Sequence, residues 1–240
     1  MLCMVSNELF DFLKIQEDRG SDYRHSQIEK HPEVHQPLKE TAYNFGNVIS
    51  QFDKDIDQDF LDPFLRIQSC LAPRNDSRQR LSQPYFLITV CKDSIWEESA
   101  GYYVQIYADR CYLGGGIHLP GKNALRKIRS EILASAGQWL QIVSGSDFEQ
   151  LFTKGLCTSR RLKKMPLGYS QRGKVASYIK MSDFFTNEEF PKEVFLNALN
   201  NNKIAGFLQA TKPLVDFLNR GLEQTISQRA KLDLLSIIGF

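Results

Sequence analysis

Residues 101–132 carry the clearest alternation of apolar and polar side chains in the chain. They begin with GYYVQIYA, a run of aromatic and β-branched residues of the kind that strands favour. Side chains alternate between the two faces of a strand, so Tyr102, Val104 and Ile106 would share one face. We therefore expect a strand over residues 102–108 that turns this face toward the core.

The same stretch predicts a hairpin followed by a helix. Residues 109–110 can form a tight turn, after which residues 111–115 return as a second strand. A Pro-Gly pair at 120–121 then breaks the chain, and Asn123 can cap a helix. The apolar positions of this helix recur at helical spacing: Leu125, Ile128, Ile132 and Leu133.

The front of the chain predicts helices and then strands. We expect two helices within residues 6–50, with Pro32 and Pro37 making the stretch around them irregular. A short strand is expected over residues 64–70. The run YFLITVC at residues 85–91 is apolar on both faces, which predicts a central strand of a sheet.

The end of the chain predicts closing helices over residues 188–199 and 204–222. Pro213 would start a new helix or kink the existing one. The remaining segment, residues 223–240, ends in the apolar sequence LDLLSIIGF.

The composition is that of an ordinary soluble globular protein, with 42% apolar and 24% charged residues. The sequence has no run of about 18 apolar residues, so a membrane helix is not expected. Its first residues lack the pattern of a secretion signal. The five cysteines are scattered and odd in number, which favours reduced thiols over a disulfide framework. We therefore expect a cytoplasmic protein with no membrane association.

The net charge of +2 hides two oppositely charged regions. Residues 1–70 hold thirteen acidic and seven basic side chains, whereas residues 150–182 hold eight basic ones and no acidic one. Such a basic segment can bind nucleic acid, an acidic partner or the chain's own acidic front. Tyr169 and Tyr178 could stack on bases, although no known nucleic-acid motif accompanies them. The predicted basic patch consists of Arg160, Arg161, Lys163, Lys164, Arg172 and Lys174.

A run of three glycines, residues 114–116, lies at the end of the predicted hairpin. Glycines there could let backbone amides approach an anion near a helix start. The run matches neither the phosphate-loop nor the dinucleotide pattern. A strand bulge, or the close approach of another backbone, explains it more simply. If an anion binds, the sequence points to Arg74, Gly114, Gly115, Gly116, Lys122 and Arg129.

Patterns for catalysis and metal binding are weak. His118 could act as a general base, with Asp109 or Cys111 nearby. More often, such a histidine has a structural role, as a packed or capping residue. No serine lies in a G-x-S-x-G elbow, and no carboxylate pair has positions that the sequence fixes. A helix-breaking proline interrupts the front histidines, so no metal cluster is expected from His25, His31 and His35. We expect no catalytic residue, metal or cofactor.

Several pieces of sequence together indicate a family. They are GYYVQI, LGGGIHLPG, the Leu125/Ile128-Arg129 helix, LKKMPLGY and KPLVDFLNRGL. In their order and spacing, from about Gly101 to Leu222, the chain resembles the uncharacterised family known as domain of unknown function 2461. The front half resembles it through Phe12-Leu13-Lys14 and the R-x9-P-Y spacing of Arg74, Pro84 and Tyr85. The resemblance implies a compact α+β domain and no established reaction.

Some polar residues typical of that family are absent here. Family members usually carry a stretch resembling R-D-x-R-F-x-x-D-K-x-P-Y-K before the central strand. This chain keeps Arg74, Pro84 and Tyr85 but lacks the acid–lysine pair and the final lysine. The asparagine pair and tryptophan of the first helix are also replaced, around residues 17–23. If the family has an enzymatic site there, the resemblance implies that this chain has lost it.

We therefore expect an α+β fold: a mostly antiparallel sheet with a central hairpin, packed by N-terminal and C-terminal helices. Residues 1–222 would form a single domain, with a helical front over 1–63 and a sheet-and-helix body over 64–222. Residues 223–240 would form a C-terminal tail.

The expected function is a non-enzymatic binding or structural role in a cytoplasmic protein assembly. The tail could dock in the groove of a protein partner or pack on the chain's own core. Its apolar residues are Leu234, Leu235, Ile237, Ile238 and Phe240. Two alternatives stay open. One is an enzyme or anion-binding protein with its site at the glycine run, and the other is a nucleic-acid-binding protein that uses residues 150–182.

Overall fold

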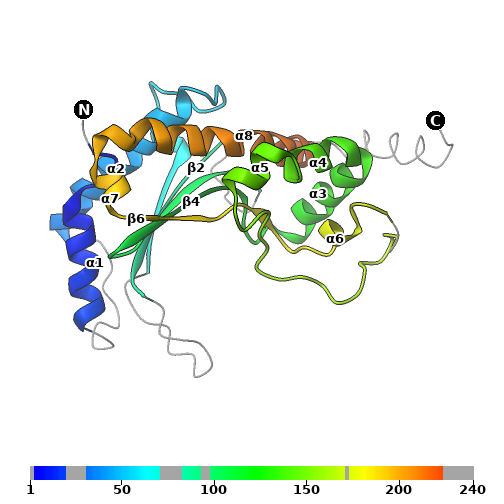
Figure 1. The fold of residues 1–240 in the computed structure, drawn as a ribbon, viewed down its shortest axis with the longest axis horizontal. Coiled ribbons are helices and arrows are strands. Elements are labelled where there is room, and N and C mark those ends of the chain that lie inside the picture. The colour runs from blue at the N-terminus through cyan, green and yellow to red at the C-terminus, as the bar shows by residue number, and fades with distance from the viewer. Residues whose placement is uncertain (1–2, 20–30, 71–82, 93–97, 171–172, 224–240) are drawn as a thin grey trace. The chain divides into compact units, whose positions relative to one another are not determined.

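A computed structural model describes residues 3–19, 31–70, 83–92, 98–170 and 173–223 (Figure 1). The chain forms two compact units. Unit 1 comprises Met1–Lys92, Tyr102–Gly114 and Glu188–Gln209, and unit 2 comprises Asp93–Gly101, Gly115–Asn187 and Ala210–Phe240. The single domain expected over residues 1–222 stays a prediction.

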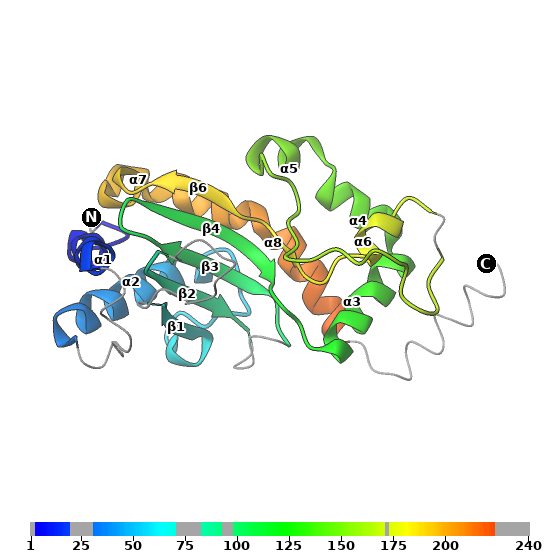
Figure 2. The ribbon, with the colours of Figure 1, turned by 90° about the horizontal axis from the view of Figure 1, so that it is seen from below.

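The fold is α+β, as expected, and its sheet is antiparallel (Figure 2). Its strands are β1 (Leu65–Cys70), β2 (Tyr85–Cys91), β3 (Gly101–Ile106), β4 (Arg110–Ile117), β5 (Phe184–Phe185) and β6 (Glu188–Pro191). The strand order is β1-β2-β3-β4-β5, and β6 also pairs with β4. The β5 strand pairs with the last residues of β4, and β6 pairs with its first residues.

In unit 1 the β3–β4 hairpin and the β2 strand confirm the sequence prediction. At the turn, the Tyr107 amide donates to the Arg110 carbonyl at 2.8 Å. Tyr102, Val104 and Ile106 are all buried, as the alternation predicted. Helix α1 (Asn7–Arg19) contacts α2 (Pro32–Ser50), and α2 packs against β1 and β2.

Two predictions for the helices were wrong. Helix α2 starts at Pro32 and continues through Pro37, so no irregular stretch separates these prolines. Pro32 costs little at the first helical position, because its missing N–H would have no intrahelical partner there. Pro37 lies inside the helix, which continues through it with one intrahelical hydrogen bond fewer. Residues 188–199 form β6, α7 (Glu193–Leu196) and a short 3₁₀ turn instead of one helix. The backbone of β6 is held as a strand by its pairing with β4.

The closing helix α8 (Asn201–Glu223) confirms the last predicted helix and runs through Pro213. Its second half belongs to unit 2, together with α3 (Lys122–Ala134), α4 (Ala136–Val143), α5 (Ser146–Leu151) and α6 (Ala176–Ile179). Trp139 is fully buried in unit 2, and three rings surround it: Tyr178, Phe184 and Phe217.

The predicted cap of helix α3 was wrong. Gly121 is the N-cap residue and makes no side-chain cap hydrogen bond. Asn123 lies inside the first turn, where its side-chain oxygen accepts from Arg126 at 3.0 Å. Within the part of the chain that the structure describes, no helix combines the length and apolarity needed to cross a membrane.

Candidate functional site

The basic segment starts in unit 2 on a short antiparallel pairing. Cys157 pairs with Phe185, and Arg161 pairs with Met181. The Cys157 amide donates to the Phe185 carbonyl at 2.7 Å, and the Arg161 guanidinium donates to the carbonyl of Ser177 at 2.8 Å. The first part of the segment is therefore fixed by backbone contacts.

Most of the segment's charges face solvent. The exposed basic residues are Lys154, Arg160, Arg161, Lys163, Lys164 and Lys174. Leu167, which lies between Lys164 and Lys174 along the chain, is fully exposed, at 100%. Tyr178 is half-buried, and its ring packs edge-on against the buried Trp139 at 5.5 Å. Arg172 lies outside the described residues.

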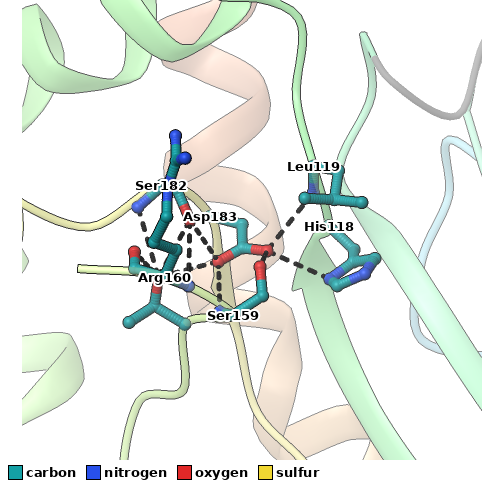
Figure 3. A network of polar contacts seen from close by, with 7 residues as sticks. His118, Leu119, Ser159, Arg160, Ser182 and Asp183 are labelled. Atoms are coloured by element: carbon teal, nitrogen blue, oxygen red, sulfur yellow. Dashed lines mark hydrogen bonds and ion pairs between the residues drawn. The ribbon is translucent and has the colours of Figure 1, made fainter. Parts of the chain in front are cut away.

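One buried carboxylate anchors this segment (Figure 3). Asp183 is fully buried, and its Oδ1 accepts from the Thr158 hydroxyl at 2.7 Å and the Ser159 amide at 2.7 Å. The Ser182 hydroxyl donates to the same oxygen at 3.2 Å. The Ser159 hydroxyl donates to Oδ2. We call these residues, together with His118, the Asp183 cluster.

His118 approaches the cluster from the end of β4. Its Nδ1 lies 3.1 Å from Oδ2 of Asp183, and the Leu119 amide lies 3.4 Å from the same oxygen. The His118 side chain is 44% exposed, and its ring meets Phe185 edge-on at 5.3 Å. Leu119 has φ of 48°, a conformation that residues with a side chain rarely adopt. A strained backbone thus accompanies the point where His118 reaches the carboxylate.

The electrostatics of the cluster are set by opposing effects. Burial raises the pKa of the Asp183 carboxyl, but the hydrogen bonds from His118, Ser159 and Thr158 lower it by more. Its pKa therefore lies well below the ordinary value, and Asp183 is charged at neutral pH. Because Nδ1 of His118 faces this carboxylate, Nε2 is the nitrogen left to accept a proton.

Other residues of unit 2 occupy the space where side chains would stand on Gly115 and Gly116. A Cβ on Gly115 would lie 2.6 Å from the Thr211 hydroxyl oxygen, and one on Gly116 would meet the Phe184 carbonyl oxygen. Gly116 also has φ of +136°, which favours glycine. The Gly115 amide donates to the Thr186 hydroxyl at 3.1 Å. This is the close approach of another backbone that the sequence suggested.

Two of the remaining predicted anion-binding residues, Lys122 and Arg129, lie on helix α3. Lys122 is its exposed first residue. Arg129 is buried, and its guanidinium donates to the Met181 carbonyl at 2.9 Å, while its Nε has no hydrogen-bond partner among the described residues. Burial lowers the pKa of Arg129, and the nearby Tyr169 partly opposes this effect. Arg74 lies outside the described residues, so the anion site stays a prediction.

The sequence did not identify Asp183. The expected neighbours of His118 were Asp109 or Cys111, but its carboxylate partner is Asp183. Asp109 instead pairs with Arg110 at 2.7 Å. One signal was present: Asp183 is the first acidic residue after the basic run, directly after a serine.

The front histidines form no metal site in the described part of the chain, where no three metal-ligating side chains gather. His31 lies 3.0 Å from a Glu33 carboxylate oxygen through its Nδ1. His25 lies outside the described residues, as do the tail residues Leu234, Leu235, Ile237, Ile238 and Phe240.

The fold and the cluster define the chain as an α+β protein with an antiparallel sheet and a buried polar centre. The family model described as "Conserved hypothetical protein (DUF2461)" matches residues 8–217. The chain therefore belongs to this family, and the match covers much of the front half as well as the expected region from Gly101 onward. A search of the curated proteins gives no match.

Proposed function

We propose that this protein acts without catalysis, as a binding subunit that holds an acidic protein partner through its basic segment. The observation that supports this most is the run of exposed cations between Lys154 and Lys174, with no acidic residue among them. Charges of one sign on neighbouring residues attract a partner of the opposite sign and speed its association.

The Asp183 cluster supports the proposal because it fixes residues 158–160 of the basic segment. Three consecutive residues are tied down beside it: Thr158 and Ser159 donate to Asp183, and the Arg160 amide donates to the Ser182 hydroxyl at 3.1 Å. A surface held in one conformation loses less conformational entropy on binding than a free loop. The cluster thus has a structural use that needs no reaction.

Leu167 favours a protein partner over nucleic acid. A fully exposed leucine beside cations can enter an apolar pocket of a protein, whereas phosphates offer it nothing. Of the two tyrosines that could stack on bases, Tyr178 packs edge-on against Trp139, while Tyr169 is half-buried. Nucleic acid is therefore the weaker candidate.

The proposal is tested by affinity capture from a lysate at physiological salt, followed by identification of the retained molecules. The test variant carries Arg160→Ser, Arg161→Ser, Lys163→Ser and Lys164→Ser. The matched control carries Lys14→Ser, Lys39→Ser, Lys54→Ser and Lys203→Ser, which removes the same charge elsewhere. We expect an acidic protein that the wild type and the control retain and the test variant loses. Equal retention by all three proteins contradicts the proposal, and loss of nucleic acid alone replaces it with the nucleic-acid function.

A second candidate, proton-transfer catalysis, is favoured by one observation: the half-exposed His118 is oriented by a buried, charged Asp183. A carboxylate in this position fixes the tautomer of a histidine that acts as a general base. Hydrolysis of carboxylic and phosphate esters would be measured for the wild type, His118→Gln and the control His35→Gln, which alters an exposed histidine. Activity lost only in His118→Gln would place catalysis above the binding role.

A further inference from the structure

A groove of about 790 Å³ lies in unit 2, lined by residues of α4, α5 and the second half of α8. Its apolar lining includes Ile142 of α4, Phe148 and Leu151 of α5, and Pro213 and Phe217 of α8. Leu151 is 41% exposed there, although it is a large apolar side chain. A groove with such a lining suits an apolar segment of chain.

We propose that this groove is the docking site of the chain's own segment 232–240. The segment reads LDLLSIIGF and carries six large apolar side chains in nine residues. Burying such side chains is favourable relative to leaving them in water. The segment therefore needs a covering surface, and the proposal does not depend on the partner proposed for the basic segment.

The connection along the chain favours this segment over a separate molecule. Helix α8 ends at Glu223, and Arg220, in its last turn, lines the groove together with Ala210. The distance along the helix from Arg220 back to Ala210 is about 15 Å, at 1.5 Å per residue. The linker of residues 224–231 can span up to about 26 Å when extended. It is thus long enough to bring segment 232–240 back over the groove.

Tethering also gives the segment an advantage in concentration. A segment joined by a short linker has an effective concentration in the millimolar range at a neighbouring site. A second copy of the chain, or a partner, would have to compete with it from solution. Occupation within one chain is therefore favoured even when the intrinsic affinity of the segment is modest.

The test is disulfide trapping in the full chain. The test variant combines Leu151→Cys with Ile237→Cys, and the matched control combines Leu133→Cys with Ile237→Cys. Leu133 lies on α3, is 46% exposed, and does not line the groove. After mild oxidation, mass spectrometry identifies which cysteines are joined and whether the bond lies within one chain or between two.

We expect a bond within one chain that forms about tenfold faster in the test variant than in the control, because the effective concentration is high only at the groove. A bond that forms mainly between two chains overturns the proposal in favour of a second copy as the occupant. Equal rates in the two variants, or no bond between the introduced cysteines, overturn it outright.

Discussion

Oδ2 of Asp183 lies 3.1 Å from Nδ1 of His118, which joins a fully buried carboxylate to a half-exposed imidazole. The two residues lie near opposite ends of the segment Gly115–Asn187 of unit 2: His118 follows β4 and Asp183 precedes β5. Between them along the chain lie helices α3–α6 and the basic segment. A buried ion that is satisfied in this way keeps its surroundings in one arrangement.

Asp183→Asn should lower the free energy of unfolding by roughly 2–4 kcal/mol, because the charged acceptor of several buried donors is lost. Urea unfolding at neutral pH measures this change. Asp216→Asn is the matched control, since Asp216 is 53% exposed and pairs with Lys212 on the surface of α8. We expect the control to change stability by less than about 1 kcal/mol. A control as costly as Asp183→Asn would contradict this account of the cluster.

The difference between the wild type and Asp183→Asn should depend on pH. The pKa of Asp183 in the folded protein lies below its value in the unfolded chain, which is about 3.9 for an ordinary aspartate. Its contribution is therefore fully present above that value and is lost as pH falls toward the folded pKa. The difference in free energy of unfolding, measured from pH 7 down to about pH 3, should be constant above about pH 4 and should begin to shrink below it. A difference that does not shrink at the acidic end would show that Asp183 does not titrate as described.

Gly115→Ala should destabilise the protein by about 1–3 kcal/mol, because the added methyl group meets the side chain of Thr211. Thermal unfolding measures the change. The control Gly206→Ala, inside α8 with open space around it, should be neutral or stabilising by up to about 1 kcal/mol. Adding Thr211→Ala to Gly115→Ala should recover part of the loss. Strict additivity of the two changes would contradict the contact.

Tyr102→Phe should destabilise the protein by about 1.5–3 kcal/mol. The Tyr102 hydroxyl donates at 2.7 Å to the carboxylate of Asp53, and both residues are buried. A hydrogen bond to a charged group in the interior is among the stronger ones. Tyr112→Phe removes a comparable bond to Glu189 at the surface and should cost less than about 1 kcal/mol. Guanidinium unfolding compares the two variants. Equal losses of stability would contradict the claim that the buried hydrogen bond contributes more than the surface one.

Local patterns predicted the elements whose structure depends on nearby residues. The boundaries of β2 match the run YFLITVC, and α8 follows the apolar spacing through Pro213. Residues 188–191 were expected to be helical but form β6. Their conformation is set by pairing with β4, which is far away in the sequence. The spacing of apolar residues within 188–191 does not indicate a pairing with so distant a strand.

The Asp183 cluster shows the same limit at the level of a site. Its donors come from His118 and from residues 158–159, and no fixed spacing along the sequence relates these residues to Asp183. The glycine run was easier to interpret, because a chain of glycines directly indicates close approach of other atoms. Gly115 and Gly116 are indeed closed in by Thr211 and Phe184.

The central claim, that the basic segment holds a protein partner, is tested most directly at Leu167. Leu167→Ser leaves every charge in place and removes only the fully exposed apolar side chain. The control is Leu199→Ser, at a leucine that is 83% exposed elsewhere. The measurement is the amount of partner protein retained by each variant in affinity capture at physiological salt. We predict at least about a tenfold loss for Leu167→Ser, the equivalent of about 1.4 kcal/mol, and no loss for the control. Retention that is unchanged in Leu167→Ser would contradict the account.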